Sequence, residues 1–202
     1  SVYGMNDVTH LGFQDIPMLS NIPNLVYLAP TTKEEYIAML DWSIEQNEHP
    51  VAIKLPGGAM VSGRPVTKNF GDLNKYEVTQ KGSKVALLGL GTFYSLANAV
   101  ADEMKSELGI DATVINPYYI TGLDEELLES LKADHSVVVT IEDGILDGGF
   151  GEKIARFYGD SDMKVLNYGL KKEFLDRYDV EEVLKDNRLD AEMIAEDVKG
   201  LL

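Results

Sequence analysis

The sequence contains no cysteine, which excludes disulfide scaffolds, thiolate metal sites and cysteine nucleophiles. Positive charge is scarce, because 18 Lys and Arg stand against 34 Asp and Glu and the net charge is −16. Nucleic-acid binding relies on Lys and Arg to neutralise phosphates, so we expect no nucleic-acid partner. No apolar run approaches the ~20 residues that span a bilayer, and the first residues lack the basic and apolar regions of a signal peptide. We therefore expect no membrane partner and a cytoplasmic protein.

The composition is that of a globular chain, with 45% hydrophobic and 26% charged residues among 202. At about 150 residues per domain, this length allows one large domain or two small ones. The chain begins with Ser1 and not with Met. From this we expect a trimmed protein or a piece of a longer one.

Apolar, β-branched runs alternate with helical patterns along most of the chain, which predicts an α/β fold with a mostly parallel sheet. In the first part, strands are expected over 25–28 and 51–55, on either side of a helix over 33–46. Residues 57–82 hold five glycines and little periodicity, which predicts an irregular connection between domains. In the second part we expect strands over 85–88, 113–115, 136–141 and 164–167, and helices over 94–108, 123–131, 151–158 and within 180–202.

Two glycine-containing turns follow predicted strands. Gly89-Leu90-Gly91-Thr92 could offer backbone N–H groups to a phosphate, but Tyr94 occupies the third glycine position of the dinucleotide pattern. A plain strand-to-helix turn is therefore favoured. The turn from Asp143 to Gly151 lacks the spacing of a calcium loop, which favours a glycine-rich turn. The adjacent carboxylates of Glu142 and Asp143 could titrate abnormally if buried, although we expect them to be solvated or to cap a helix.

The three histidines lie far apart, and without cysteine their spacing does not indicate a structural metal site. We expect His49 to be solvated in a polar loop and His135 to lie at the surface or at a helix end. His10 lies in a polar loop between Asp7 and Gly12. Because imidazole is the natural proton carrier near neutral pH, His10 is either a functional histidine or a capped loop residue.

The motifs, taken in order, resemble one family. The first part resembles the later half of the pyrimidine-binding domain in the transketolase superfamily of thiamine-diphosphate enzymes, through Thr9-His10-Leu11-Gly12, Asp15, Asn21-Ile22-Pro23-Asn24 and Leu28-Ala29-Pro30-Thr31. The second part resembles the C-terminal domain of that superfamily, through Leu88–Thr92, Ile115–Tyr118, Val139–Asp143, Gly148–Gly151 and Asn167–Leu170. Within the superfamily the chain is most similar to the 1-deoxy-D-xylulose-5-phosphate synthase family.

The resemblance implies an incomplete pyrimidine-binding-type three-layer α/β unit over residues 1–65, a linker over 66–82 and a transketolase C-terminal-like α/β domain over 83–202. It further implies a transferase of isoprenoid biosynthesis that uses thiamine diphosphate and Mg²⁺, with pyruvate and glyceraldehyde 3-phosphate as substrates and a homodimer or split-subunit partner. Two alternatives stay open. One is the C-terminal half of a transketolase acting on sugar phosphates, or a 2-oxo acid dehydrogenase β-type subunit; the other is a non-catalytic subunit-association module.

The same resemblance assigns His10 as the catalytic histidine that contacts a substrate oxygen and moves protons. The family often has an aspartate four residues earlier, where this chain has Asn6 followed by Asp7; both are candidate substrate-binding residues. Leu55-Pro56-Gly57-Gly58 replaces the family's Tyr-Pro-Arg-Gly, which leaves Lys54 as the nearby candidate cation. The family's cofactor-activating glutamate and metal-binding Gly-Asp-Gly segment do not occur. We therefore expect a chain that is inactive alone, with the cofactor ligands mostly outside it.

Overall fold

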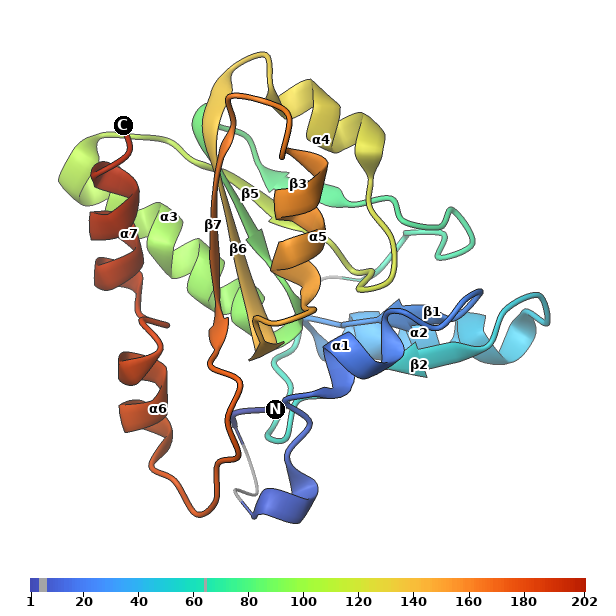
Figure 1. Cartoon of the computed structure of the whole chain (residues 1–202). Helices are drawn as coiled ribbons and strands as arrows, with labels where there is room; N and C mark the ends of the chain where they lie inside the picture. Colours follow the sequence, from blue (N-terminus) through green and yellow to red (C-terminus); the bar gives the residue numbers. More distant parts are fainter. Residues whose placement is uncertain (4–6, 64) are drawn as a thin grey trace.

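The computed structural model describes residues 1–3, 7–63 and 65–202, which form two sheets of unequal size (Figure 1). The larger sheet has the order β3-β5-β4-β6-β7, and only the β3–β5 pair is antiparallel. The smaller sheet is the parallel pair β1–β2. The expected α/β class with a mostly parallel sheet is thus confirmed. The elements in chain order are η1 (Val8–His10), α1 (Asp15–Leu19), β1 (Val26–Leu28), α2 (Lys33–Glu45), β2 (Val51–Ile53), β3 (Glu77–Gln80), β4 (Lys84–Gly89), η2 (Gly91–Phe93), α3 (Tyr94–Leu108), β5 (Thr113–Asn116), α4 (Glu125–Leu131), β6 (His135–Ile145), α5 (Phe150–Phe157), β7 (Lys164–Leu170), α6 (Val180–Asp186) and α7 (Ala191–Lys199).

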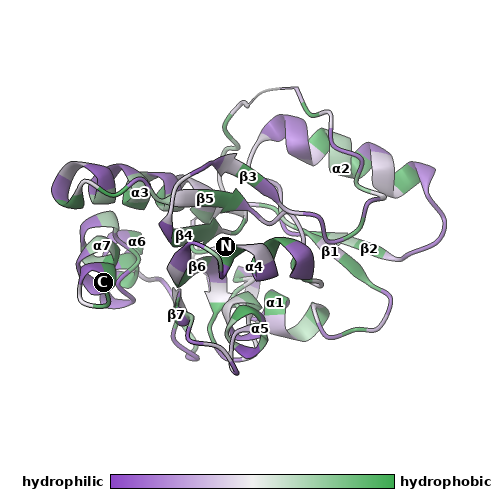
Figure 2. Ribbon diagram, turned by 90° about the horizontal axis from the view of Figure 1, so that it is seen from above, coloured by the Kyte–Doolittle hydropathy of each residue, from purple (hydrophilic) through white to green (hydrophobic). Residues whose placement is uncertain are grey.

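Helices cover both faces of the larger sheet. The helices α3 and α7 lie on one face, and α4 and α5 lie on the other (Figure 1). Successive strand residues divide between the two cores, since Val85 and Leu87 pack toward α3 while Ala86 and Leu88 pack toward α4 and α5. Burial on both faces explains why these strands are continuous apolar runs in the sequence. Along α3, hydrophilic and hydrophobic residues alternate (Figure 2), as expected for a helix with one buried face.

The smaller sheet docks against the segment that follows β5. The Ala29 N–H donates to the Tyr118 carbonyl at 2.8 Å, and the Ile120 N–H donates to the Tyr27 carbonyl at 2.7 Å. These bonds close the edge of β1 that does not face β2. The buried side chains of α1, β1 and α2 belong to the same core as those of α4 and α5. The first part of the chain is therefore packed continuously onto the second.

Most predicted elements are confirmed to within a few residues, and the predicted helix over 94–108 is α3 with those bounds. The prediction of an irregular connection over 57–82 is wrong near its end, because Glu77–Gln80 forms the strand β3. This strand is polar and pairs only with β5 at the edge of the sheet. An edge strand with solvent on one side needs no apolar run, which is why the sequence did not indicate it.

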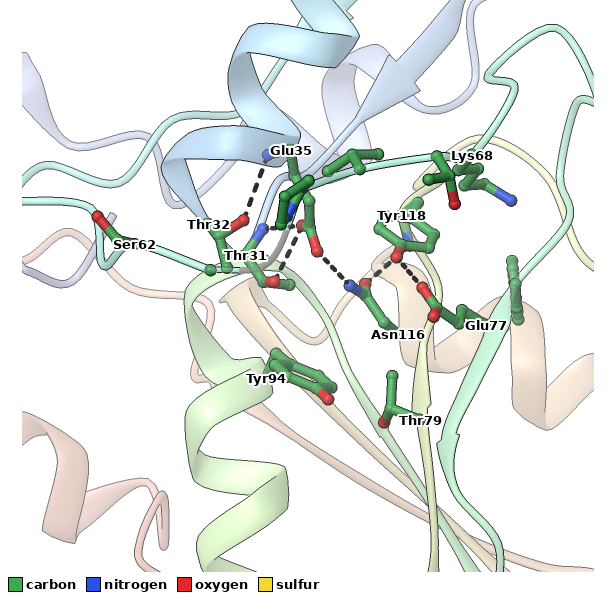
Figure 3. Close-up of a pocket in the computed structure, with 15 residues that line it drawn as sticks. Thr31, Thr32, Glu35, Ser62, Lys68, Glu77, Thr79, Tyr94, Asn116 and Tyr118 are labelled. Carbon is green, nitrogen blue, oxygen red and sulfur yellow. Dashed lines mark hydrogen bonds between the residues drawn. The ribbon is translucent and has the colours of Figure 1, made fainter.

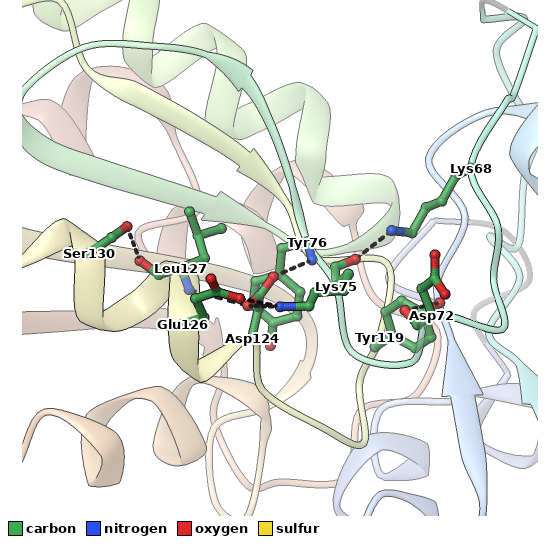
Figure 4. Close-up of polar contacts among 9 residues, drawn as sticks. All are labelled: Lys68, Asp72, Lys75, Tyr76, Tyr119, Asp124, Glu126, Leu127 and Ser130. Carbon is green, nitrogen blue, oxygen red and sulfur yellow. Dashed lines mark hydrogen bonds and ion pairs between the residues drawn. The ribbon is translucent and has the colours of Figure 1, made fainter.

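The segment that leads into β3 is anchored to the start of α4 (Figure 4). The Asp124 carboxylate accepts hydrogen bonds from the Tyr76 N–H at 3.0 Å and from the Leu127 N–H at 3.2 Å. Lys75 lies 3.4 Å from Asp124 and 2.8 Å from the exposed Glu126. Because exposed ion pairs contribute little, the two amide bonds to the buried Asp124 are the main anchor.

A buried carboxylate near the end of β6 caps the next helix. Glu142 is fully buried and accepts hydrogen bonds from the Phe150 and Gly151 N–H groups, each at 2.7 Å. A Cβ atom at Gly149 would lie 2.6 Å from Glu142 Oε2, so a side chain there would displace the carboxylate. The hypothesis of a helix-capping acid is confirmed for Glu142. Burial raises the pKa of Glu142 to about 7, although the two N–H donors oppose this shift.

Glu142 should make the stability of the protein depend on pH. Its ordinary pKa of 4.5 rises to about 7 on folding, so its stabilising contribution is present below pH 4.5 and is lost as the pH rises through about 7. The free energy of unfolding in urea should therefore fall more steeply between about pH 5 and about pH 8 in the wild type than in Glu142→Gln. Glu107→Gln, at an exposed position of α3, is the control. Identical slopes for wild type and Glu142→Gln would contradict the assignment.

Candidate functional site

His10 and Lys54 line one open cavity of about 390 Å³ between the first loop and the smaller sheet. His10 is the last residue of η1, and Lys54 directly follows β2. Tyr27 of β1 and Gly57 also line the wall. The structure thus brings together two of the four residues that the resemblance selected.

His10 is oriented by its own loop. The Asp7 carboxylate caps η1 by accepting hydrogen bonds from the Thr9 N–H at 3.1 Å and the Thr9 hydroxyl at 2.8 Å, which lower the pKa of Asp7. Thr9 Oγ1 also lies 2.8 Å from His10 Nδ1. Because the single hydroxyl proton is donated to Asp7, Oγ1 accepts from Nδ1–H, and neutral His10 keeps Nε2 as its free acceptor. His10 is exposed, so this nitrogen is accessible to a ligand.

Lys54 joins β2 to the loop that carries His10. Only 8% of its side chain is exposed, and its Nζ donates to the Gly12 carbonyl at 2.8 Å and lies 3.7 Å from the Asp15 carboxylate. An ammonium group has three N–H donors, so the Gly12 bond does not exhaust them. Lys54 therefore fixes the loop and also places a positive charge at the cavity.

Of the other residues, Asp7 was predicted as a site residue from the sequence and Tyr27 was not. Asp7 lies beside His10 through Thr9 but does not line the cavity. Asn6 lies outside the described residues. The sequence did not identify Tyr27 as a site residue. The feature that could have indicated it is the hydroxyl that it carries within the otherwise apolar run of β1. Tyr27 is buried, which raises the pKa of its hydroxyl.

The two remaining histidines lie away from this cavity. His49 Nδ1 is 2.9 Å from Asn24 Oδ1. The expectation of a helix-end position is confirmed for His135, because its Nδ1 lies 3.2 Å from the carbonyl oxygen of Leu131, the last residue of α4. The alternative of a surface position is wrong, since only 4% of its side chain is exposed. Its Nε2 lies 2.8 Å from Thr113 Oγ1. The polar tip is satisfied by a neighbouring strand, so a histidine could be buried where the sequence suggested solvent.

The first glycine turn connects β4 to η2 and α3 by close packing. In doubly wound sheets, ligands bind at the carboxyl ends of the strands where the strand order reverses, and in β5-β4-β6-β7 this point is at β4. Gly91 and Thr92 of this turn line two spaces, one of about 10 Å³ beside Ile16 and Ala29 and one of about 470 Å³ on another side. A Cβ atom at Gly89 would lie 2.6 Å from Tyr94 Cα. The glycine thus permits close packing, and the expected strand-to-helix turn is confirmed.

Within residues 1–3, 7–63 and 65–202, no group of three or more His, Asp or Glu could hold a metal ion. In the same part of the chain, no helix is long and apolar enough to cross a membrane.

Known proteins resemble this chain over its whole length. The model of the family "Transketolase, C-terminal domain" matches residues 74–194. The 1-deoxy-D-xylulose-5-phosphate synthase of Clostridium tetani is 33% identical over 98% of this chain and 32% of its own length. The 1-deoxy-D-xylulose-5-phosphate synthase of Crocosphaera subtropica is 34% identical over 99% of this chain and 32% of its own length. The chain thus spans about a third of the length of these curated relatives.

A solved structure described as "Split gene transketolase, inactive beta4 tetramer" has a TM-score of 0.80 to this chain. Its sequence is 23% identical to this one, and the match covers 98% of this chain and 64% of the chain in that structure. At this identity the likeness shows that the two share a fold, across both sheets described above.

Replacing Lys54 should destabilise the junction between the loop and β2. Lys54→Met leaves the Gly12 carbonyl and the Asp15 carboxylate without their partner, and the free energy of unfolding in urea should fall by about 1–3 kcal/mol. Lys33→Met is the matched control, because Lys33 is exposed and lies 3.9 Å from Glu34. Its effect should stay within about 0.5 kcal/mol. Equal losses in the two variants would show that Lys54 does not hold the loop.

Proposed function

This chain belongs to the family of the transketolase C-terminal domain, and we propose that it forms the C-terminal part of a thiamine-diphosphate-dependent transferase of the 1-deoxy-D-xylulose-5-phosphate synthase type. The observation that carries the proposal is the placement of His10 and Lys54 in one cavity. The identity to such synthases across nearly the whole chain supports it. The proposed reaction converts pyruvate and glyceraldehyde 3-phosphate to 1-deoxyxylulose 5-phosphate and carbon dioxide.

In this reaction His10 holds and moves a proton at a substrate oxygen through Nε2. The bond from Nδ1–H to Thr9 fixes the ring and its tautomer, so that the acceptor nitrogen is the one that is free. Neutral imidazole can accept a proton and return it near physiological pH. Thr9 and Asp7 act through His10 and need no contact with substrate.

Lys54 supplies positive charge where both proposed substrates are anions. The net charge of the chain is −16, so the average field repels such molecules and a local cation is needed at the cavity. Because Gly57 replaces the family's arginine, phosphate recognition here relies on a single ammonium group without the bidentate geometry of a guanidinium. This substitution supports a second candidate, a transketolase or 2-oxo acid dehydrogenase type of enzyme with a different donor or acceptor.

The complete enzyme needs more chain than these residues. We assign residues 1–65 to the C-terminal part of a pyrimidine-binding domain, 66–82 to a linker and 83–202 to the C-terminal domain. In the described part, β2 pairs only with β1, whereas parallel sheets are normally larger and covered on both faces. Further strands beyond β2, from the same polypeptide or from a partner subunit, would complete this sheet. The residues that hold thiamine diphosphate and Mg²⁺ are assigned to that remainder.

The chain by itself should be inactive. Mixed with thiamine diphosphate, Mg²⁺, pyruvate and glyceraldehyde 3-phosphate, it should yield no deoxyxylulose phosphate, whereas the complete enzyme should. Product formation is followed by mass spectrometry, with a ketose phosphate replacing pyruvate in a parallel reaction to separate the two enzyme types. Sustained turnover by the isolated chain would refute the assignment of the cofactor ligands to residues outside it.

His10→Ala in the complete enzyme should lower kcat by about 10²- to 10⁴-fold, because general acid–base groups contribute that much. The melting temperature should be unchanged, since His10 is exposed. His49→Ala, whose side chain contacts Asn24 away from the cavity, is the control and should retain wild-type turnover. Normal turnover in His10→Ala would contradict the catalytic role and would show that His10 is only a capped loop residue.

A further inference from the structure

The loop between β7 and α6 reaches back to the first loop of the chain, which carries His10. The two loops lie side by side at the same end of the molecule (Figure 1). The Tyr178 hydroxyl donates to the Val2 carbonyl at 3.0 Å, and the Asp176 carboxylate accepts from the Val8 N–H at 3.1 Å. These bonds join residues that are 176 and 168 positions apart. The second part of the chain thus contacts the loop of the proposed catalytic residue directly.

The three N–H groups of η1 all have acceptors, but only one of these acceptors is distant in the sequence. The Thr9 N–H donates to the Asp7 carboxylate at 3.1 Å, and the His10 N–H donates to the Asp7 carbonyl at 2.8 Å. These local bonds set the shape of η1 and would persist if the whole turn moved. The Val8 N–H instead donates to Asp176. This bond therefore fixes where η1, and His10 with it, lies relative to the second part of the chain.

The two ends of the first loop are held by β6. The buried Asp143 carboxylate accepts from the Val2 N–H at 2.9 Å. The Ile145 N–H donates to the Phe13 carbonyl, also at 2.9 Å. The bond to Asp176 holds the middle of the loop, where η1 lies. Because its acceptor is a charged carboxylate, this bond is of the stronger kind.

Loss of the Asp176 bond should not unfold the junction between the two parts of the chain. Asp176 is exposed, and the docking of the smaller sheet relies on other contacts. Besides the main-chain bonds of β1, the buried Glu35 of α2 accepts a hydrogen bond from Asn116 Nδ2 of β5 at 3.2 Å (Figure 3). Replacing Asp176 therefore changes the placement of the first loop and leaves the packing of the core intact.

We infer that Asp176 is a positioning residue for His10. It acts through the Val8 N–H and needs no contact with substrate. His10 exchanges a proton with a substrate oxygen only within a hydrogen-bond reach of about 2.6–3.2 Å, and a misplacement of about 1 Å can cost about 10²-fold in rate. The catalytic consequence rests on the proposed function, whereas the placement of η1 does not.

The placement is tested by NMR on the ¹⁵N-labelled 202-residue chain. In Asp176→Ala, the Val8 amide hydrogen should exchange with water about three- to tenfold faster, as expected for the loss of one hydrogen bond. The ¹H–¹⁵N NOE of Thr9 and His10 should fall, because a loop with fewer contacts moves more on the ps–ns timescale. Asp176→Asn keeps an oxygen acceptor and should stay within about twofold of the wild-type exchange rate. Glu173→Ala, at an exposed position of the same loop, is the control and should match the wild type.

A second variant removes the donor in place of the acceptor. Val8 is the first residue of η1, where proline is tolerated, and the extended backbone of Asp7 suits a residue before proline. Val8→Pro should therefore fold, and Asp176→Ala should cause no further fall in the His10 NOE once the donor is gone. Unchanged Val8 exchange and an unchanged His10 NOE in Asp176→Ala would overturn the inference.

In the complete enzyme, Asp176→Ala should lower kcat by about 10- to 100-fold, and Asp176→Asn should restore most of the loss. In a His10→Ala background, Asp176→Ala should have no further effect, because it acts through His10; a general loss of folded enzyme would lower kcat in both backgrounds. Wild-type kcat in Asp176→Ala, with His10→Ala impaired, would overturn the inference and leave the proposed function standing. Normal turnover in His10→Ala would refute the proposed function, and the NMR test would then decide the placement alone.

Discussion

The contact between β1 and the segment after β5 is the interaction on which the rest of the molecule depends. Two main-chain hydrogen bonds, between Ala29 and Tyr118 and between Ile120 and Tyr27, hold the smaller sheet on the larger one. Tyr27 of β1 lines the His10 cavity, and Thr31, just beyond the strand, lines a second cavity of about 720 Å³.

Lysine side chains reinforce that contact in a chain with a large excess of negative charge. Lys54 donates to the Gly12 carbonyl, and Lys153 Nζ donates to the Ser20 and Ile120 carbonyls, each at 3.2 Å. Burial lowers the pKa of Lys153 to about 8, with Glu142 opposing the shift. Lys153 therefore connects α5 to the segments that follow α1 and β5. Lys54 connects β2 to the first loop and places positive charge at the His10 cavity.

The chain belongs to the family of the transketolase C-terminal domain and covers about a third of the length of its curated relatives. Both findings agree with the two unequal parts of the structure. The C-terminal domain has a full five-stranded sheet with helices on both faces. The first part has two parallel strands and contributes a histidine and a lysine to a cavity that is open to solvent. The proposed function accordingly assigns the remaining walls of this cavity to chain beyond these residues.

The sequence by itself determined the α/β class, the order of most elements and the bounds of α3, because apolar periodicity and caps such as Thr32 and Asp124 are local signals. It also selected His10 and Lys54 through ordered motifs. Only the tertiary structure decided that these two share a cavity, that Glu142 is a buried cap with a raised pKa, and that His135 is buried against Thr113. These properties depend on residues brought together from distant positions, and desolvation and hydrogen-bond partners exist only once the chain has packed.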